Sequence, residues 1–223
     1  MNRISTGVKM FDDLLGGGYE IDSITTVYGP AGSGKTNMAI LSAISMASQG
    51  KKVLYIDTEG GFSIERFKQV TSNFKKVLSN IIFLQPTNFQ EQKRAFEKLK
   101  GLANSKVGLI IVDTITMLYR LQKSNGEEVS ETNKDLAMQI GILNEIARKQ
   151  NIPVLLTNQV YTSFDDGRIQ VVGGDIIKYS SKCLLEIQTF HANKRKLILR
   201  KHRSIPGEKE VYFEIVQEGI REA

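Results

Sequence analysis

The strongest constraint on the fold is a glycine-rich run near the start of the chain, which reads Gly29-Pro30-Ala31-Gly32-Ser33-Gly34-Lys35-Thr36. This run, called the phosphate loop below, fills the pattern G-x-x-x-x-G-K-[ST] at each required position. Glycines permit backbone angles and a close approach that side chains would block, so several N–H groups can turn inward around one polyphosphate. The apolar run 23–28 before it and the helix-like stretch 35–49 after it predict a strand, a loop and a helix in succession.

Two side chains at the end of the phosphate loop are expected to meet a bound nucleoside triphosphate. Lys35 would reach the β- and γ-phosphates, and Thr36 would hold Mg²⁺ through its hydroxyl. The helix that begins near Lys35 adds free amides and a partial positive charge. The alternative is a glycine turn that only caps a helix, and the pattern arises by chance in roughly one chain of this length in a hundred. The flanking strand and helix favour nucleotide binding, with ATP and Mg²⁺ as ligands.

The rest of the chain alternates between β-rich apolar runs and helix-like stretches. This alternation predicts an α/β fold with a largely parallel central sheet flanked by helices. After residue 180, the runs 182–189, 196–201 and 210–216 predict an antiparallel extension of the sheet around a turn at 191–194. The segments 121–130 and 161–174 are polar or glycine-rich, and we expect both to be loops. The other expected strands are 23–28, 52–56, 81–84, 107–112 and 153–157, and the expected helices are 35–49, 64–73, 89–104 and 131–149.

Length, charge and cysteine content narrow the class of protein. The 223 residues suit one domain spanning 1–223, and Lys and Arg outnumber Asp and Glu by 30 to 24. The net charge of +6 is compatible with a polyanionic partner but does not identify which polyanion binds. The single cysteine, Cys183, excludes an internal disulfide framework and lies in a strand-like run where we expect it to be buried. No apolar run approaches the ~20 residues that span a bilayer, so a cytoplasmic protein without membrane association is expected.

Three polar residues follow apolar strands and are candidates for binding or hydrolysing the phosphates. Asp113 ends the run Leu109-Ile110-Ile111-Val112 and could orient Mg²⁺, although an aspartate can also simply end a strand. Glu59 stands just past the strand 52–56 and could accept a proton from the attacking water, with a solvated loop glutamate as the alternative. Gln159 follows the strand 153–157 and offers an amide that could sense the γ-phosphate, although a simple turn would also explain it.

These motifs together resemble the RecA-type recombinase family, and within it the archaeal RadA and RadB branches. The similarity covers nearly the whole chain. Its most discriminating parts are the Thr-Glu-Gly and Thr-Asn-Gln-Val signatures, which are more specific than the phosphate loop. The motifs are Ile4-Ser5-Thr6-Gly7, Leu14-Leu15-Gly16-Gly17-Gly18, GPAGSGKT, YIDTEGGF, LIIVDTIT, Thr157-Asn158-Gln159-Val160, Gly173-Gly174 and Phe213-Glu214-Ile215.

The resemblance implies a RecA-type ATPase core and a role for each candidate residue. Glu59 would be the catalytic base, Asp113 the metal-orienting aspartate and Gln159 the γ-phosphate sensor. Arg66 matches an arginine that lies against adenine in this family, with a solvated helix arginine as the alternative. The stretches 120–130 and 161–174 look like the two DNA-binding loops of the family.

Departures from the family pattern favour the RadB branch. Full recombinases carry an N-terminal helix-hairpin-helix domain and a linker that docks into the neighbouring subunit, whereas this chain starts at the ATPase core. The second loop is acidic at Asp165-Asp166, and the sequence reads Lys201-His202-Arg203-Ser204-Ile205-Pro206 where recombinases place an aspartate before a proline. The resemblance therefore implies slow ATP hydrolysis, no autonomous strand exchange and a dimer rather than a long filament. The implied partners are DNA, single-stranded or branched, the main recombinase and Holliday-junction-processing enzymes.

Basic residues near the carboxyl end form the densest positive cluster and are candidates for DNA phosphates. A solvated hairpin is the alternative. Tyr161 and Phe164 could stack unpaired bases beside the second loop, or could anchor that loop to the core. The predicted DNA-binding residues are Arg120, Lys123 and Arg168 at the loops and Lys194, Arg195, Lys196, Arg200, Lys201 and Arg203 in the cluster.

Three functions remain open on these observations. The first is an ATP-binding, DNA-binding accessory recombinase that acts in homologous recombination and DNA repair. The second is a KaiC-like signalling ATPase without a DNA role, which DNA binding would separate from the first. The third is a binding module in which ATP is a structural ligand, and phosphate release would separate it from both.

Overall fold

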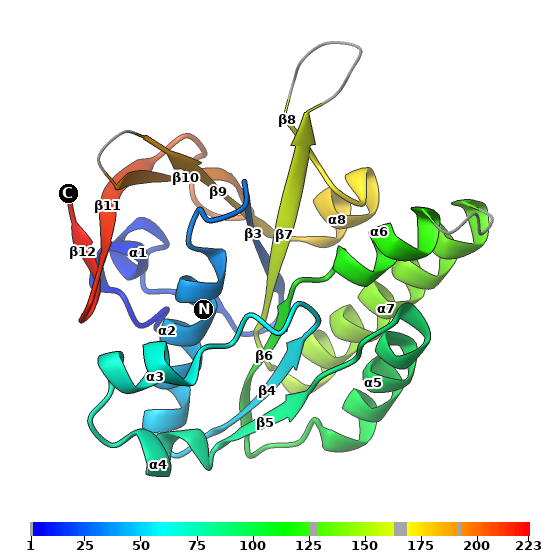
Figure 1. The fold of residues 1–223 in the computed structure, drawn as a ribbon, viewed down its shortest axis with the longest axis horizontal. Helices are drawn as coiled ribbons and strands as arrows, with labels where there is room; N and C mark the ends of the chain where they lie inside the picture. Colours follow the sequence, from blue (N-terminus) through cyan, green and yellow to red (C-terminus); the bar gives the residue numbers. More distant parts are fainter. Residues whose placement is uncertain (1, 125–128, 163–168, 191–192) are drawn as a thin grey trace.

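The computed structural model describes residues 2–124, 129–162, 169–190 and 193–223 (Figure 1). In these residues the main sheet runs in the order β12-β11-β10-β9-β3-β7-β6-β4-β5, and β8 pairs with β7 outside that path. A separate two-stranded sheet joins β1 to β2. The strands are β1 Arg3–Ile4, β2 Tyr19–Glu20, β3 Ile24–Gly29, β4 Lys52–Asp57, β5 Ile81–Leu84, β6 Val107–Asp113, β7 Val154–Thr162, β8 Ile169–Val171, β9 Cys183–Thr189, β10 Lys194–His202, β11 Glu210–Val216 and β12 Gly219–Glu222.

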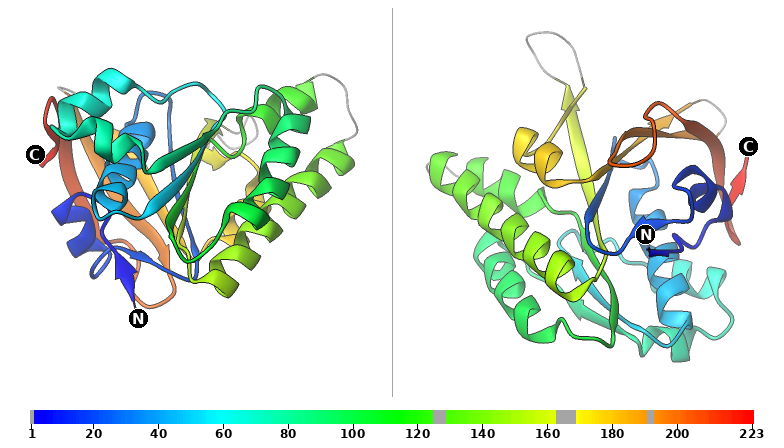
Figure 2. Two further views of the ribbon diagram at one scale, coloured as in Figure 1. Left: turned by 90° about the horizontal axis from the view of Figure 1, so that it is seen from below. Right: turned by 180° about the vertical axis from the view of Figure 1, so that it is seen from behind.

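Helices cover both faces of the sheet and give the protein two apolar cores (Figures 1 and 2). On one face, α1 and α2 pack with α4 against the strands, and on the other face α5 and α7 pack with α6 and α8. Both faces of the central strands are therefore buried, which is why β4 and β6 read as nearly continuous apolar runs. The helices are α1 Lys9–Leu14, α2 Lys35–Ser48, α3 Ile64–Val70, α4 Phe74–Leu78, α5 Phe89–Leu102, α6 Met117–Ser124, α7 Val129–Gln150 and α8 Gly174–Ser180.

The predicted division into a parallel core and an antiparallel extension is confirmed. Strand β3 runs parallel to β7 and β9, and β4 runs parallel to β5 and β6. Strands β9, β10, β11 and β12 then follow one another as antiparallel neighbours. Strand β9 is thus the element where the two halves of the sheet meet, and the buried Cys183 lies at its first position.

Three expectations about local structure are wrong. The helix expected at 64–73 ends at Val70, because Thr71 has an extended backbone, and a second helix, α4, begins at Phe74. The loop expected at 121–130 is helical up to Ser124, where α6 ends, and α7 begins at Val129. Leu118 and Tyr119, which are buried, hold α6 on the sheet, and this tertiary packing outweighs the polar sequence around them.

The segment expected to be a loop at 161–174 also contains regular structure. Strand β7 continues to Thr162 and pairs antiparallel with β8, with Val160 opposite Val171. The two strands project from the carboxyl end of the parallel sheet (Figures 1 and 2). The sequence-based expectation also missed α1, α8, β12 and the β1–β2 pair, which are short.

The carboxyl ends of the parallel strands form the edge where functional side chains gather, as in other open α/β sheets. The phosphate loop follows β3, Glu59 follows β4, Asp113 ends β6 and Gln159 lies in β7. No helix in the described ranges is long and apolar enough to span a membrane.

Candidate nucleotide site and adjacent basic pocket

The phosphate loop connects β3 to α2 and depends on two glycines with positive φ. Gly32 has φ of +72° and Gly34 has φ of +106°, a region that side-chain-bearing residues rarely adopt. A Cβ atom at Gly34 would also lie 2.7 Å from Cδ1 of Ile215, and one at Gly29 would lie 2.6 Å from the carbonyl oxygen of Ile187. The loop therefore needs glycine for its turns and for its close packing against β9 and β11.

Lys35 is held inside the phosphate loop. Its Nζ donates hydrogen bonds to the carbonyl oxygens of Gly29, at 3.0 Å, and Pro30, at 2.8 Å. Only 7% of the residue is exposed, and this burial lowers the pKa of the ammonium, while the charges of Glu59 and Asp113 oppose the shift. The fold thus places one desolvated cation where phosphate oxygens would meet it.

Asp113 lies at the end of β6 and is 2% exposed. Its carboxylate accepts hydrogen bonds from the hydroxyls of Tyr55, at 3.0 Å, Thr157 and Thr36. Burial raises the pKa of Asp113, and these three hydroxyl donors oppose the shift. Thr36 and Asp113 therefore present neighbouring oxygens beside the loop, which is the donor set that Mg²⁺ prefers when phosphates and water complete its shell.

The described residues hold no cluster of three or more His, Cys, Asp or Glu that could bind a metal ion unaided. The oxygens of Thr36 and Asp113 fit a magnesium ion that arrives with a nucleotide rather than one held by the protein alone. The donor chemistry therefore agrees with the ATP and Mg²⁺ expected from the sequence.

Glu59 belongs to a tight loop after β4 that is organised by Asp57. The buried carboxylate of Asp57 accepts hydrogen bonds from the backbone N–H groups of Glu59, at 3.3 Å, Gly61, at 3.1 Å, and Phe62, at 3.2 Å. Sequence reasoning missed Asp57, although an aspartate directly before Thr-Glu-Gly-Gly is the pattern of a side chain that caps its own loop.

Gln159 and Glu59 lie side by side. The amide Nε2 of Gln159 donates to Oε1 of Glu59 at 2.7 Å, and Thr114 donates its hydroxyl to the same oxygen at 3.1 Å. The carbonyl oxygen of the Gln159 side chain accepts from Nη1 of Arg120 at 2.9 Å. The fold therefore brings the predicted base and the predicted sensor together and links both to a cation on α6.

Comparison with known proteins agrees with this geometry. A model of the Rad51 family matches residues 1–223. The chain belongs to the Rad51 family. It is 42% identical over 220 residues to the DNA repair and recombination protein RadB of Methanobrevibacter smithii, covering 94% of this chain and 92% of that protein. It is 43% identical over 213 residues to RadB of Methanococcus maripaludis strain C7, covering 95% and 97%.

A solved structure is similar over the same extent. The structure described as the crystal structure of the RadB recombinase matches with a TM-score of 0.85 and 37% identity, covering 99% of each chain. The predicted resemblance to RecA-type recombinases, and within them to RadB, is confirmed, as is the RecA-type fold. Rad51 family members are in general DNA-dependent ATPases, so this chain has the core that such an activity requires.

Arg66 is positioned by several hydrogen bonds in this family member and is not a solvated helix arginine. Its Nε donates to Oδ1 of Asn37 at 2.7 Å, and Nη1 and Nη2 donate to the carbonyl oxygens of Val216 and Gly219 at 2.8 and 2.9 Å. These bonds tie α3 to α2 and to the turn between β11 and β12. A role of Arg66 against adenine stays a prediction.

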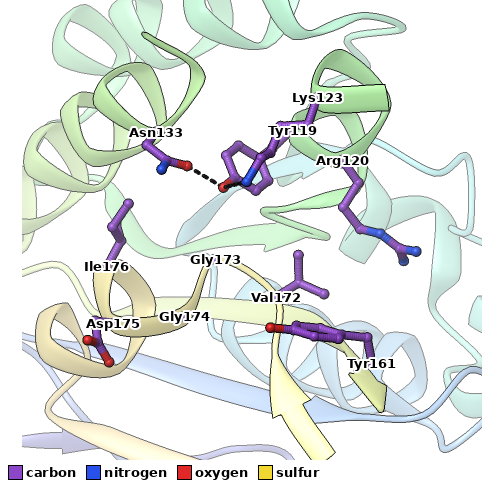
Figure 3. A pocket seen from close by; sticks show the side chains of 10 residues that line it. All are labelled: Tyr119, Arg120, Lys123, Asn133, Tyr161, Val172, Gly173, Gly174, Asp175 and Ile176. Atoms are coloured by element: carbon purple, nitrogen blue, oxygen red, sulfur yellow. Dashed lines mark hydrogen bonds between the residues drawn. The ribbon is translucent and has the colours of Figure 1, made fainter. Parts of the chain in front are cut away.

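A pocket of about 780 Å³ is lined in part by Arg120, the residue that donates to Gln159 (Figure 3). Arg120 and Lys123 come from α6 on one side of it, and Tyr161, which is 49% exposed, comes from β7 on the other. The ammonium of Lys123 lies 5.1 Å from the centroid of the Tyr119 ring and donates to its hydroxyl. The pocket is lined by Tyr119, Arg120, Lys123, Asn133, Tyr161, Val172, Gly173, Gly174, Asp175 and Ile176.

Most cations of the predicted carboxyl-terminal cluster have partners within the chain. Lys196 pairs with Glu210 at 3.0 Å, and its Nζ lies 5.6 Å from the ring centroids of both Phe190 and Tyr212. Arg200 pairs with Glu186 at 2.6 Å. The remaining contacts join Lys201 to the carbonyl oxygen of Lys178, Arg203 to Glu20 and Asp22, and Arg195 to Ser33 in the phosphate loop.

The cluster is therefore less available to a polyanion than the sequence implied. Lys194 is exposed on β10, whereas the other five cluster residues are engaged. Arg120 and Lys123 line one pocket, and no residue of the cluster lines it. Arg168, Phe164 and the acidic pair Asp165-Asp166 lie outside the described residues.

Proposed function

We propose that this chain is an ATP-binding and DNA-binding accessory member of the RecA-type recombinases. It acts in homologous recombination and DNA repair, hydrolyses ATP slowly and does not exchange strands by itself. The names of the relatives, DNA repair and recombination protein RadB, support the process. The observation that carries the proposal is Gln159, whose one side chain contacts both Glu59 in the nucleotide site and Arg120 in the basic pocket.

The nucleotide half of the proposal rests on groups that meet at the end of the parallel sheet. Lys35 supplies the charge that faces the β- and γ-phosphates, and the loop amides surround them. Thr36 and Asp113 would hold Mg²⁺, which neutralises charge on the phosphate oxygens when it is bound. Glu59, oriented by Gln159 and Thr114, accepts the proton of the attacking water.

The DNA half of the proposal rests on the pocket that is lined by Arg120, the hydrogen-bond partner of Gln159. Arg120 and Lys123 provide positive charge for phosphates, and the half-exposed ring of Tyr161 can stack on an unpaired base. Because Lys196, Arg200 and Arg203 of the cluster pair with carboxylates, the pocket is the better primary contact for DNA in the proposal. Lys194 and Arg168 stay predicted DNA contacts in the proposal, and Lys196, Arg200, Lys201 and Arg203 do not.

Slow hydrolysis in this proposal rests on how the subunits assemble. Preorganised charges at the transferring phosphate supply most of the rate in such enzymes, and the RecA family completes these charges across a subunit interface. A chain that forms a dimer rather than a long filament leaves most sites half complete. The main recombinase and Holliday-junction-processing enzymes are the proposed protein partners, since an accessory protein acts through them.

One experiment tests both halves. Binding of single-stranded, duplex and branched DNA is measured across a salt series, with and without ATP and Mg²⁺, and calorimetry measures nucleotide binding. We expect the logarithm of the affinity for DNA to fall linearly with the logarithm of salt concentration, and ATP to change that affinity. Nucleotide binding without any DNA binding at low salt would support a KaiC-like signalling ATPase instead. A folded protein that ignores ATP with Mg²⁺ present would overturn the whole proposal.

A further inference from the structure

The first residues of β10 lie directly behind the phosphate loop. Nε of Arg195 donates a hydrogen bond to the carbonyl oxygen of Ser33 at 3.0 Å, although the two residues are 162 positions apart. Ser33 is fully buried, and its hydroxyl makes no hydrogen bond among the described residues. Its N–H makes a long bond, 3.3 Å, to the carbonyl oxygen of Pro30. Arg195 is therefore the contact that fixes how this part of the loop is turned.

The guanidinium of Arg195 is itself held in place. Its Nη1 donates to the backbone oxygen of Asn193 at 2.7 Å and to the side-chain oxygen of Asn193 at 2.6 Å. Asn193 adopts a left-handed backbone with φ of 64°, which asparagine tolerates better than most residues, and its amide donates to the carbonyl oxygen of Ile215 at 3.2 Å. Asn193 thus orients the guanidinium toward the phosphate loop.

The orientation of one peptide group connects this contact to the ligand. In a planar trans peptide the C=O and the next N–H point in opposite directions. Arg195 holds the Ser33 carbonyl outward, toward the hairpin, so the N–H of Gly34 points the other way, into the phosphate loop. A Cβ atom on Gly34 would lie 2.7 Å from Cδ1 of Ile215 and 3.7 Å from Nε of Arg195, so both side chains pack closely against this glycine.

We propose that Arg195 is a positioning residue of the phosphate loop, which orients the Ser33–Gly34 peptide so that the Gly34 N–H faces the phosphates. The inference rests on the proposed nucleotide binding. It moves Arg195 from the DNA surface, where sequence reasoning placed it, to the nucleotide site. It also makes the hairpin of β9 and β10 part of that site, although in the proposal no residue of this hairpin touches the phosphates.

The test compares Arg195→Ala with Lys209→Ala, which removes one exposed positive charge from the same extension. Calorimetry with Mg²⁺ measures ATP, ADP and adenosine binding, and thermal unfolding checks the fold of each variant. We expect Arg195→Ala to weaken ATP and ADP binding by about 10- to 100-fold, the range for a lost charge-assisted hydrogen bond, with adenosine binding unchanged. Lys209→Ala is expected to bind all three as the wild type does.

Two further variants keep the inference testable if Arg195→Ala fails to fold. Arg195→Met keeps an apolar stem but has no N–H donor for the Ser33 carbonyl oxygen, so it should lose affinity for ATP, and a wild-type affinity would overturn the inference. Asn193→Ala removes one support of the guanidinium and should give a smaller loss. Wild-type ATP affinity in Arg195→Ala, with weakened DNA binding, would return Arg195 to the DNA surface. If the wild type itself binds no ATP, the proposed function fails instead.

Discussion

Gln159 donates its side-chain amide to the carboxylate of Glu59 at 2.7 Å, so the end of β7 and the loop after β4 meet at one hydrogen bond. The hydroxyl of Thr114 donates to the same carboxylate oxygen at 3.1 Å, so two neutral donors orient the Glu59 side chain. A substitution of Glu59 can therefore separate ATP hydrolysis from ATP binding.

We expect Glu59→Gln to lower phosphate release by about 100-fold or more, since a general base contributes about 10²- to 10⁴-fold. ATP affinity should change little, because Glu59 accepts a proton from water and does not contact the phosphates in the proposal. Glu65→Gln, an exposed glutamate on α3, is the control. Equal rates in wild type and Glu59→Gln would favour the alternative in which ATP is a structural ligand.

Lys35→Ala should reduce ATP affinity by at least about tenfold. The change removes the ammonium that faces the phosphates, so the negative charge of the phosphates loses its partner. The carbonyl oxygens of Gly29 and Pro30 also lose their donor, so the loop is expected to loosen. Calorimetry with ATP and Mg²⁺ measures the effect. Lys98→Ala, an exposed lysine on α5, should bind ATP normally, and normal binding by Lys35→Ala would remove Lys35 from the site.

The double variant Arg120→Ala/Lys123→Ala should weaken DNA binding and reduce the slope of log affinity against log salt by about two, one for each lost phosphate contact. The double variant Lys75→Ala/Lys76→Ala loses the same charge from α4, on the other side of the sheet, and should retain both the affinity and the slope. Equal losses in the two variants would mean that net charge, and not the pocket, drives binding to DNA.

Phe213→Ala should lower the free energy of unfolding by about 3–5 kcal/mol, the usual cost of a large cavity in a core. Phe213 is fully buried and packs edge-on against Phe11 of α1, with ring centroids 5.2 Å apart. Urea unfolding measures the loss. Tyr179→Ala, at a tyrosine that is 75% exposed, should stay within about 0.5 kcal/mol of the wild type. A small effect at Phe213 would mean that the antiparallel extension is not part of the core.

The Cys183 thiol should resist alkylation at pH 8 in the folded protein and react once urea unfolds the chain. Burial, at 3% exposure, raises the pKa of Cys183 to about 12 from an ordinary value of 9.0. The reactive thiolate is then on the order of a thousandfold rarer in the folded state. Because the raised pKa favours the neutral form, stability should fall as pH rises from about 9 toward 12. Rapid labelling without urea would contradict the buried position in β9.

Short sequence patterns predicted the parallel half of the fold and most residues of the candidate nucleotide site. The strand expected at 81–84 matches β5, and the phosphate loop lies between β3 and α2 as its glycines predicted. The helix expected at 64–73 was split, because residue spacing alone does not reveal the extended backbone at Thr71. Helix α6 was missed because buried contacts of Leu118 and Tyr119, and not the polar sequence, hold it in place.

The sequence by itself determined that the chain carries a phosphate loop, a strand-end aspartate and the Glu59 and Gln159 signatures, because each of these depends on residues close together in the chain. Only the tertiary structure decided which cations are available to a ligand. Whether a cation can bind a ligand depends on the oxygens that folding brings beside it. The oxygen beside Arg195 belongs to Ser33, 162 residues away in the sequence, and an oxygen beside Arg203 belongs to Asp22, 181 residues away. The same contacts turned a predicted DNA-binding arginine into a neighbour of the phosphate loop.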